Sequence, residues 1–207
     1  MQLRRLVTDL VDLGALGSGA YRIRSEPVRL RALLDSCAES FAEGAHAKGL
    51  TLEVGLRSGV PPLIHTDEAR LRQVLTVLLE NAVRLTQQGS VSLLALPAEP
   101  PPGGVSQPAR LAGTWVELHV ADTGPGIGEE DQRKLLQLFH VLKSGERGAG
   151  SGLSLAIAAR WCAVLGGCLR IESDGESGSS FVVCLPVGQA ADPEPVGNPD
   201  LSPPMPA

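Results

Sequence analysis

Apolar residues recur every three or four positions along several stretches of the chain, the spacing expected of helices that bury one face. The most regular of these stretches spans residues 66–86, where leucine, valine and alanine side chains form one continuous stripe. Thr66 or Asp67 can cap this helix, which we expect to lie in the core. The same pattern predicts further helices over residues 28–48, 129–139 and 151–166.

Other stretches alternate apolar and polar residues with a period of two, as strands with one buried face do. The clearest example is the run from residue 116 to residue 121. A segment rich in proline and glycine, residues 97–113, precedes it and is interpreted as an insertion between two strands. Further strands are predicted over residues 50–56, 91–96, 168–173 and 180–187.

The two ends of the chain differ from its middle. Residues 1–16 show helical spacing, and three glycines end this short helix by residue 19. Residues 189–207 contain six prolines and no lysine or arginine, so we expect them to be disordered. The sequence therefore predicts one domain over residues 20–188, with an appendage at each end.

Composition and charge narrow the possible functions. Of the 207 residues, 43% are hydrophobic and 20% are charged, which is typical of a soluble globular protein. The net charge of −5 argues against a nucleic-acid-binding surface, and no apolar run is long enough to span a membrane. We therefore expect a cytoplasmic segment. The four cysteines have neither metal-ligand spacing nor a disulfide-framework pattern, and each is interpreted as a small core residue.

Candidate chemistry begins where the strand over residues 116–121 meets Asp122. Gly124 and Gly126 follow it on either side of a proline, so the backbone can turn tightly and leave room for a flat ligand. The same residue types are ordinary turn formers, and a simple turn explains them equally well when they are considered alone.

A second glycine cluster, residues 148–153, opens the last predicted helix. Backbone amides at the start of a helix can bind phosphate oxygens when side chains do not cover them. A flexible loop followed by a helix cap is the alternative interpretation of the same residues. A carboxylate such as Asp122 can accept a hydrogen bond from the amino group of adenine, and the carbonyl oxygen of Asn81 suits Mg²⁺. These three features together indicate ATP.

Four segments resemble the N, G1, F and G2 boxes of the sensor histidine kinase ATP-binding domain, in that family's order and at its spacing. The resemblance covers Tyr21 to Val187, and residues 1–19 resemble the second helix of the family's dimerisation and phosphotransfer hairpin. The four segments are Leu78–Thr86, Asp122–Ile127, Leu135–Phe139 and Gly150–Leu155.

The resemblance implies a two-layer α/β (α+β) sandwich of the Bergerat type, shared by gyrases, chaperones, histidine kinases and mismatch-repair ATPases. In it a mixed, largely antiparallel sheet backs three main helices, and ATP lies under a lid, here residues 140–149. Asp122 would bind the adenine amino group, Asn81 would hold Mg²⁺, and Arg84 would replace the usual lysine near phosphate. Gly124, Gly126 and Ile127 would line the base, and Gly150, Ser151, Gly152 and Leu153 would contact the phosphates.

The implied function is transfer of the ATP γ-phosphate to a histidine, which the family carries upstream of this segment. The implied partners are a histidine-containing dimerisation domain, in the same chain or another, a response regulator, and a second copy in a homodimer. A module that senses ATP or binds proteins without catalysis is the alternative, because Val77, Leu85 and Ser154 depart from the family pattern. An ATP-driven clamp is disfavoured, since Val77 stands where such proteins place a catalytic acid.

Overall fold

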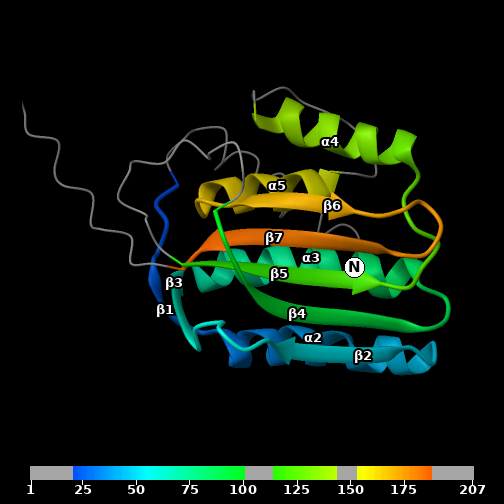
Figure 1. Ribbon diagram of the computed structural model, residues 1–207, viewed down its shortest axis with the longest axis horizontal. Coiled ribbons are helices and arrows are strands. Elements are labelled where there is room, and N and C mark those ends of the chain that lie inside the picture. Colours follow the sequence, from blue (N-terminus) through cyan, green and yellow to red (C-terminus); the bar gives the residue numbers. More distant parts are fainter. Residues whose placement is uncertain (1–20, 101–113, 144–152, 188–207) are drawn as a thin grey trace, which may run out of the picture.

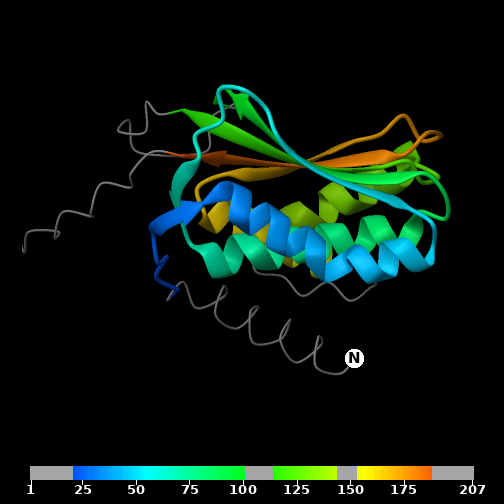
Figure 2. The same ribbon diagram turned by 90° about the horizontal axis from the view of Figure 1, so that it is seen from below.

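The computed structural model describes residues 21–100, 114–143 and 153–187, which form a sheet on one side and a layer of helices on the other (Figure 2). The main sheet has five strands. The first two strands in the spatial order given below are parallel to each other, and every other pair of neighbouring strands is antiparallel. A mixed, largely antiparallel sheet was predicted and is confirmed. In spatial order the strands are β2 (Thr51–Leu56), β4 (Ser90–Ala98), β5 (Trp115–Asp122), β7 (Ser179–Pro186) and β6 (Cys168–Glu172).

Three helices cover one face of this sheet, as predicted: α2 (Leu30–Ala47), α3 (Glu68–Leu85) and α5 (Leu153–Val164). A fourth helix, α4 (Glu129–Lys143), packs against α5 at the margin of the helical layer (Figure 1). None of the helices in the described residues is both long and apolar enough to cross a membrane.

Several predicted boundaries were wrong. Strand β4 runs to Ala98, so the first two residues of the predicted insertion over 97–113 belong to the strand. Helix α4 continues to Lys143, so the first four residues of the predicted lid over 140–149 are helical; those four residues include neither glycine nor proline to end the helix. Helix α2 begins at Leu30 and not at Val28, because the preceding strand β1 (Glu26–Arg29) pairs with β3 (Leu63–Thr66) in a separate two-stranded sheet.

The core lies between the sheet and α3. Val116, Leu118 and Val120 of β5 are fully buried, which confirms the inward face predicted from their alternation. Across from them, α3 turns its apolar stripe toward the sheet, so this helix lies at the centre of the sandwich, as predicted. The fully buried residues of that stripe are Leu71, Val74, Leu75, Leu78 and Leu79.

Asp67 fixes the start of α3 to the segment that leads into the domain. The side chain is 3% exposed, and its Oδ1 accepts a hydrogen bond from the Arg70 amide at 3.2 Å, which caps the helix. Its Oδ2 accepts from the Tyr21 hydroxyl at 2.9 Å and from the Arg24 amide at 3.1 Å. One carboxylate therefore joins two segments that are distant in sequence.

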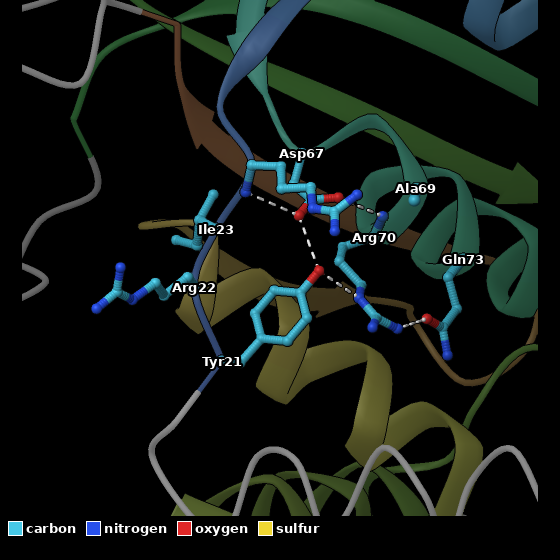
Figure 3. A pocket seen from close by; sticks show the side chains of 8 residues that line it. Tyr21, Arg22, Ile23, Asp67, Ala69, Arg70 and Gln73 are labelled. Atoms are coloured by element: carbon cyan, nitrogen blue, oxygen red, sulfur yellow. Dashed lines mark hydrogen bonds between the residues drawn. The ribbon is translucent and has the colours of Figure 1, made fainter. Parts of the chain in front are cut away.

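Arg70 extends this junction to α5 through Trp161, and Figure 3 shows its contact with Tyr21. Its Nε donates to the Tyr21 hydroxyl at 2.8 Å, and its guanidinium lies 4.6 Å from the Tyr21 ring centroid and 4.1 Å from that of Trp161. The two rings meet edge to face, 4.8 Å apart. A pocket of about 880 Å³ lies beside these side chains and extends to Gln73.

Replacing Asp67 with alanine should lower the free energy of unfolding by about 1–3 kcal/mol, because the helix cap is lost and the part-buried donors of Tyr21 and Arg24 lose their acceptor. Urea unfolding followed by circular dichroism measures this loss. Asp35→Ala is the matched control, since Asp35 makes only an exposed pair with Arg31 and its loss should cost less than about 0.5 kcal/mol. Equal losses in the two variants would contradict the role given to Asp67.

Candidate nucleotide-binding site

Asp122 is the last residue of β5, at the end of a strand in the middle of the sheet. Its register partners are Val91 on β4 and Ser179 on β7. The sequence predicted that the strand would deliver this carboxylate to a sheet edge or end, and the structure shows the second of these. The side chain is half-buried, so it can reach a ligand without being fully solvated.

Two protein donors hold the Asp122 carboxylate in place. Oδ1 accepts from the Gly124 amide at 2.8 Å, and Oδ2 accepts from the Ser179 hydroxyl at 2.6 Å. Each carboxylate oxygen has a second lone pair, so both can still accept a hydrogen bond from a ligand. Ser179 was not predicted as a site residue, because only the pairing of β5 with β7 brings it to Asp122.

The two glycines after Asp122 are required by close contacts within the protein. A Cβ atom on Gly124 would lie 2.7 Å from Asp122 Oδ1 and 3.4 Å from the hydroxyl oxygen of Thr86, which follows α3. Gly126 has a φ of +75°, and a Cβ atom there would lie 2.8 Å from the backbone of Gly175. The loop is therefore closed against both the end of α3 and the turn between β6 and β7.

That turn supports the loop through polar contacts. Ser173 Oγ accepts from the Ile127 amide at 3.0 Å, and Gln132 Nε2 donates to the carbonyls of Ile127 and Ser173 at 2.6 and 3.0 Å. Ile127 thus has a fixed backbone, and its side chain packs against the main core.

The turn itself is also held by hydrogen bonds. Those from the Ser177 hydroxyl and from two backbone amides lower the pKa of Asp174 to about 2.

Asn81 and Arg84 lie together on the last turns of α3. Asn81 is 8% exposed, and its Oδ1 accepts a hydrogen bond from Arg84 Nη2 at 2.6 Å. The oxygen that the resemblance assigns to Mg²⁺ is therefore in contact with a positive charge of the chain itself. A metal ion at this oxygen would have to share it with the guanidinium or displace it.

The described residues contain no group of three His, Cys, Asp or Glu side chains that could hold a metal ion. Val77, one turn before Asn81, is partly buried and packs against the core. A single asparagine oxygen fits Mg²⁺ that is held mainly by phosphates and water, and it does not fit an all-protein metal site. The donor set is thus compatible with a metal ion that arrives with a nucleotide.

Lys48 holds the end of α3 from outside the helix. Its Nζ donates to the carbonyls of Val83, Arg84 and Thr86 at 2.7, 2.8 and 3.2 Å. The last carbonyls of a helix have no partner within it, so this cation satisfies groups that would otherwise need water. Sequence reasoning did not find Lys48, which follows α2 and is far from α3 along the chain.

Several predicted residues lie outside the described part of the chain. Gly150, Ser151 and Gly152 are among them. Leu153 is the first residue of α5, and only its backbone is described. The same holds for the terminal segments, residues 1–19 and 189–207, and for residues 144–149 of the predicted lid. The assignments made to these residues stay predictions.

The pocket beside Tyr21 is separate from these residues. Its lining includes Asp67 and Arg70 at the first turn of α3, whereas Asn81 is about 16 Å further along that helix. The loop after Asp122 meets the opposite end of α3, at Thr86. The candidate site is therefore built at the C-terminal end of α3.

The family described as histidine kinase-, DNA gyrase B- and HSP90-like ATPase matches residues 66–189. Among similar proteins, the signal transduction histidine-protein kinase BarA of Escherichia coli (strain K12) is 32% identical over 183 residues, which cover 86% of this chain and 19% of BarA. The sensor protein TorS of the same strain is 32% identical over 197 residues, covering 93% of this chain and 20% of TorS. The chain thus spans about a fifth of these relatives.

Solved structures agree with this match. The crystal structure of full-length ShkA in complex with AMPPNP has a TM-score of 0.71 and 31% identity, and the match covers 92% of this chain and 37% of ShkA. The histidine kinase AdeS of Acinetobacter baumannii has a TM-score of 0.67, with 90% and 79% coverage, and at 24% identity it supports the fold alone. The predicted two-layer sandwich is confirmed.

Replacing Lys48 with methionine should destabilise the protein by about 1–2 kcal/mol, because three helix-terminal carbonyls lose a charged donor. The effect should be local, so amide hydrogen exchange should speed up at Thr86, whose amide donates to Ala82. Lys134→Met serves as control, since Lys134 pairs only with exposed acids on its own helix. Unchanged exchange at the end of α3 would show that Lys48 does not hold it.

Proposed function

This chain belongs to the family of histidine kinase-, DNA gyrase B- and HSP90-like ATPases, and we propose that it is the ATP-binding catalytic domain of a two-component sensor histidine kinase. Its reaction would transfer the γ-phosphate of ATP to a histidine supplied by another domain. The observation that carries the proposal is the Asp122 carboxylate, held by Gly124 and Ser179 with lone pairs left for a ligand. The similarity to the histidine-protein kinase BarA and the sensor protein TorS supports it.

In this proposal Asp122 accepts a hydrogen bond from the amino group of adenine. Its two internal hydrogen bonds fix the carboxylate before the base arrives, so little ordering is needed on binding. Gly124, Gly126 and Ile127 line the base, and their backbone positions are already set by contacts with Thr86 and the β6–β7 turn. The adenine side of the site is thus preorganised.

On the phosphate side, Asn81 is the proposed Mg²⁺ ligand and Arg84 the proposed phosphate contact. When bound, Mg²⁺ would neutralise phosphate charge during transfer. Arg84 is exposed and its guanidinium now sits on Asn81 Oδ1, so a short rearrangement of one side chain would free the oxygen and place the cation beside phosphate. Gly150, Ser151, Gly152 and Leu153 are the proposed source of amide contacts to the phosphates.

The proposed acceptor lies outside the domain. Of the histidines with described side chains, His119 Nε2 contacts Glu117 Oε2 at 3.1 Å, on the strand that leads to Asp122, whereas His46 and His65 lie on α2 and β3. We therefore propose that a histidine-containing dimerisation domain, in this chain or a partner copy, takes the phosphate and passes it to a response regulator. A cytoplasmic location is part of the same proposal, because the reaction consumes ATP.

A module that binds ATP without catalysis is the second candidate. The contact of Arg84 with Asn81 Oδ1 and the apolar Val77 one turn earlier favour it, since both weaken the case for a metal ion at this point. This candidate keeps the adenine site and predicts that nucleotide binds without phosphate transfer. The two candidates therefore differ only on the phosphate side.

Calorimetry with Mg-ATP tests the adenine site. Asp122→Ala should weaken binding roughly tenfold to a hundredfold, because a hydrogen bond to a charged group is lost. Ser179→Ala keeps the carboxylate and should have a smaller effect, and Asp35→Ala on α2 should bind as the parent does. An Asp122→Ala variant that is folded by circular dichroism and binds with parental affinity would contradict the assignment.

Phosphate transfer is tested with labelled ATP and the histidine-containing hairpin of one of the kinases compared above. We expect label on the hairpin, none on a hairpin whose acceptor histidine is glutamine, and at least tenfold less label with the Asn81→Ala variant of this chain. Nucleotide binding without any phosphate transfer would contradict the kinase proposal and favour the module that binds ATP without catalysis.

A further inference from the structure

Two cysteines that are separated in sequence face each other across neighbouring strands. Cys168 begins β6 and is the register partner of Cys184 on β7. Directly opposed residues in an antiparallel pair have Cα atoms about 4.5–5.5 Å apart and side chains on the same face. That spacing lies within the Cα range of disulfides, about 4.4–6.8 Å. Both residues are thiols in this structure.

The pair lies on the face of the sheet that turns away from the helices. Cys184 is 2% exposed and packs with Trp115 and Val182, whereas Cys168 is only half-buried. Strand β6 is the edge strand of the sheet, so a small molecule can approach Cys168 from the side. The two sulfurs therefore have different access to solvent, and Cys168 is the one that an oxidant reaches first.

A carboxylate stands next to the buried thiol. Cys184 Sγ donates to Glu117 Oε1 at 3.6 Å, and the same oxygen accepts from Arg170 Nη2 at 2.8 Å. Burial by itself would raise the pKa of Glu117, but the hydrogen bond from His119 and the charge of Arg170 outweigh it and lower that pKa. Glu117 is thus ionised, and its carboxylate accepts the hydrogen bond of the Cys184 thiol without removing the proton.

Two of the buried thiols in this region, those of Cys184 and Cys162, have raised pKa values. The hydrogen bond with Cys168 and burial raise the pKa of Cys184, so this residue keeps its proton until its sulfur forms a new bond. Burial also raises the pKa of Cys162, which is fully buried in α5 and belongs to the main core on the other face of the sheet. Cys162 is close to Cys168 in sequence but is not its cross-strand partner.

We propose that Cys168 and Cys184 are a reversible dithiol switch that closes by exchange with a small disulfide such as oxidised glutathione. In the first step the Cys168 thiolate attacks one sulfur of the small disulfide, and the other half leaves as a thiolate. In the second step the Cys184 thiol, oriented by its hydrogen bond to Glu117, attacks the Cys168 sulfur of the mixed disulfide, and the second small thiolate leaves and takes up the Cys184 proton. The protein dithiol is oxidised, the small disulfide is reduced to two thiols, and the two cysteine protons end on them.

The switch does not rest on the proposed kinase function. Cys184 lies near the C-terminal end of β7, two residues before Pro186. Ser179, which contacts Asp122, lies at the other end of the strand, about 16 Å from Cys184. Disulfide formation can therefore be scored without nucleotide. Its failure would leave the nucleotide proposal untouched, and the reverse also holds.

Incubation of the full chain with oxidised glutathione, acid quench and non-reducing peptide mass mapping tests the proposal. We expect a Cys168–Cys184 crosslink that dithiothreitol reverses, preceded by a glutathione adduct on Cys168 alone. The crosslink should persist in Cys162→Ala and disappear in Cys168→Ser. A stable adduct on Cys168 without crosslink, or a Cys162–Cys168 crosslink in the folded parent, would overturn the proposal.

The positioning role of Glu117 has its own readout. Glu117→Gln should slow conversion of the adduct to the crosslink several-fold, because a neutral amide oxygen holds the Cys184 thiol less strongly than a carboxylate does, with the first step unchanged. Glu172→Gln is the matched control, because Glu172 also pairs with Arg170, whereas the Cys184 thiol donates to Glu117. Equal second-step rates in the parent and in Glu117→Gln would remove Glu117 from the mechanism.

Discussion

The hydrogen bond from the Ser179 hydroxyl to Asp122 joins the end of β5 to the start of β7, and the candidate site depends on the register that this contact marks. The backbone of the loops around this contact has almost no conformational freedom. A Cβ atom on Gly178 would lie 2.1 Å from the Asp122 carbonyl oxygen, and one on Gly89 would lie 2.1 Å from Thr123 Oγ1. Slipping the β5–β7 register by one residue would turn Asp122 to the opposite face and expose the buried face of β5.

Helix α3 is the second fixed element, because it is held at both ends by residues from other segments. Asp67 caps its start and accepts from Tyr21 and Arg24, while Lys48 donates to the carbonyls at its end. Between these ends the apolar stripe packs against the sheet, so the helix has little scope to rotate. The position of Asn81 relative to the loop after Asp122 follows from these constraints.

Local patterns were enough to predict the features that depend on neighbouring residues. The alternation over residues 116–121 gave the buried face of β5, and helical spacing gave α3 with Asp67 as one of two candidate caps. Contacts made across the fold could not be read in this way. These contacts depend on strand register or helix packing, and no single-sequence period encodes either of them. Examples are Lys48 at the end of α3, Ser179 beside Asp122, the β1–β3 pair and the facing cysteines.

A crystal structure of the chain with Mg²⁺ and a nonhydrolysable ATP analogue tests the central claim most directly. The account predicts the adenine amino group within hydrogen-bonding distance of Asp122, with the Gly124 and Ser179 contacts kept, the metal ion on Asn81 Oδ1, and Arg84 moved from that oxygen toward phosphate. Adenine bound away from Asp122, for example in the pocket beside Tyr21 and Arg70, would contradict it.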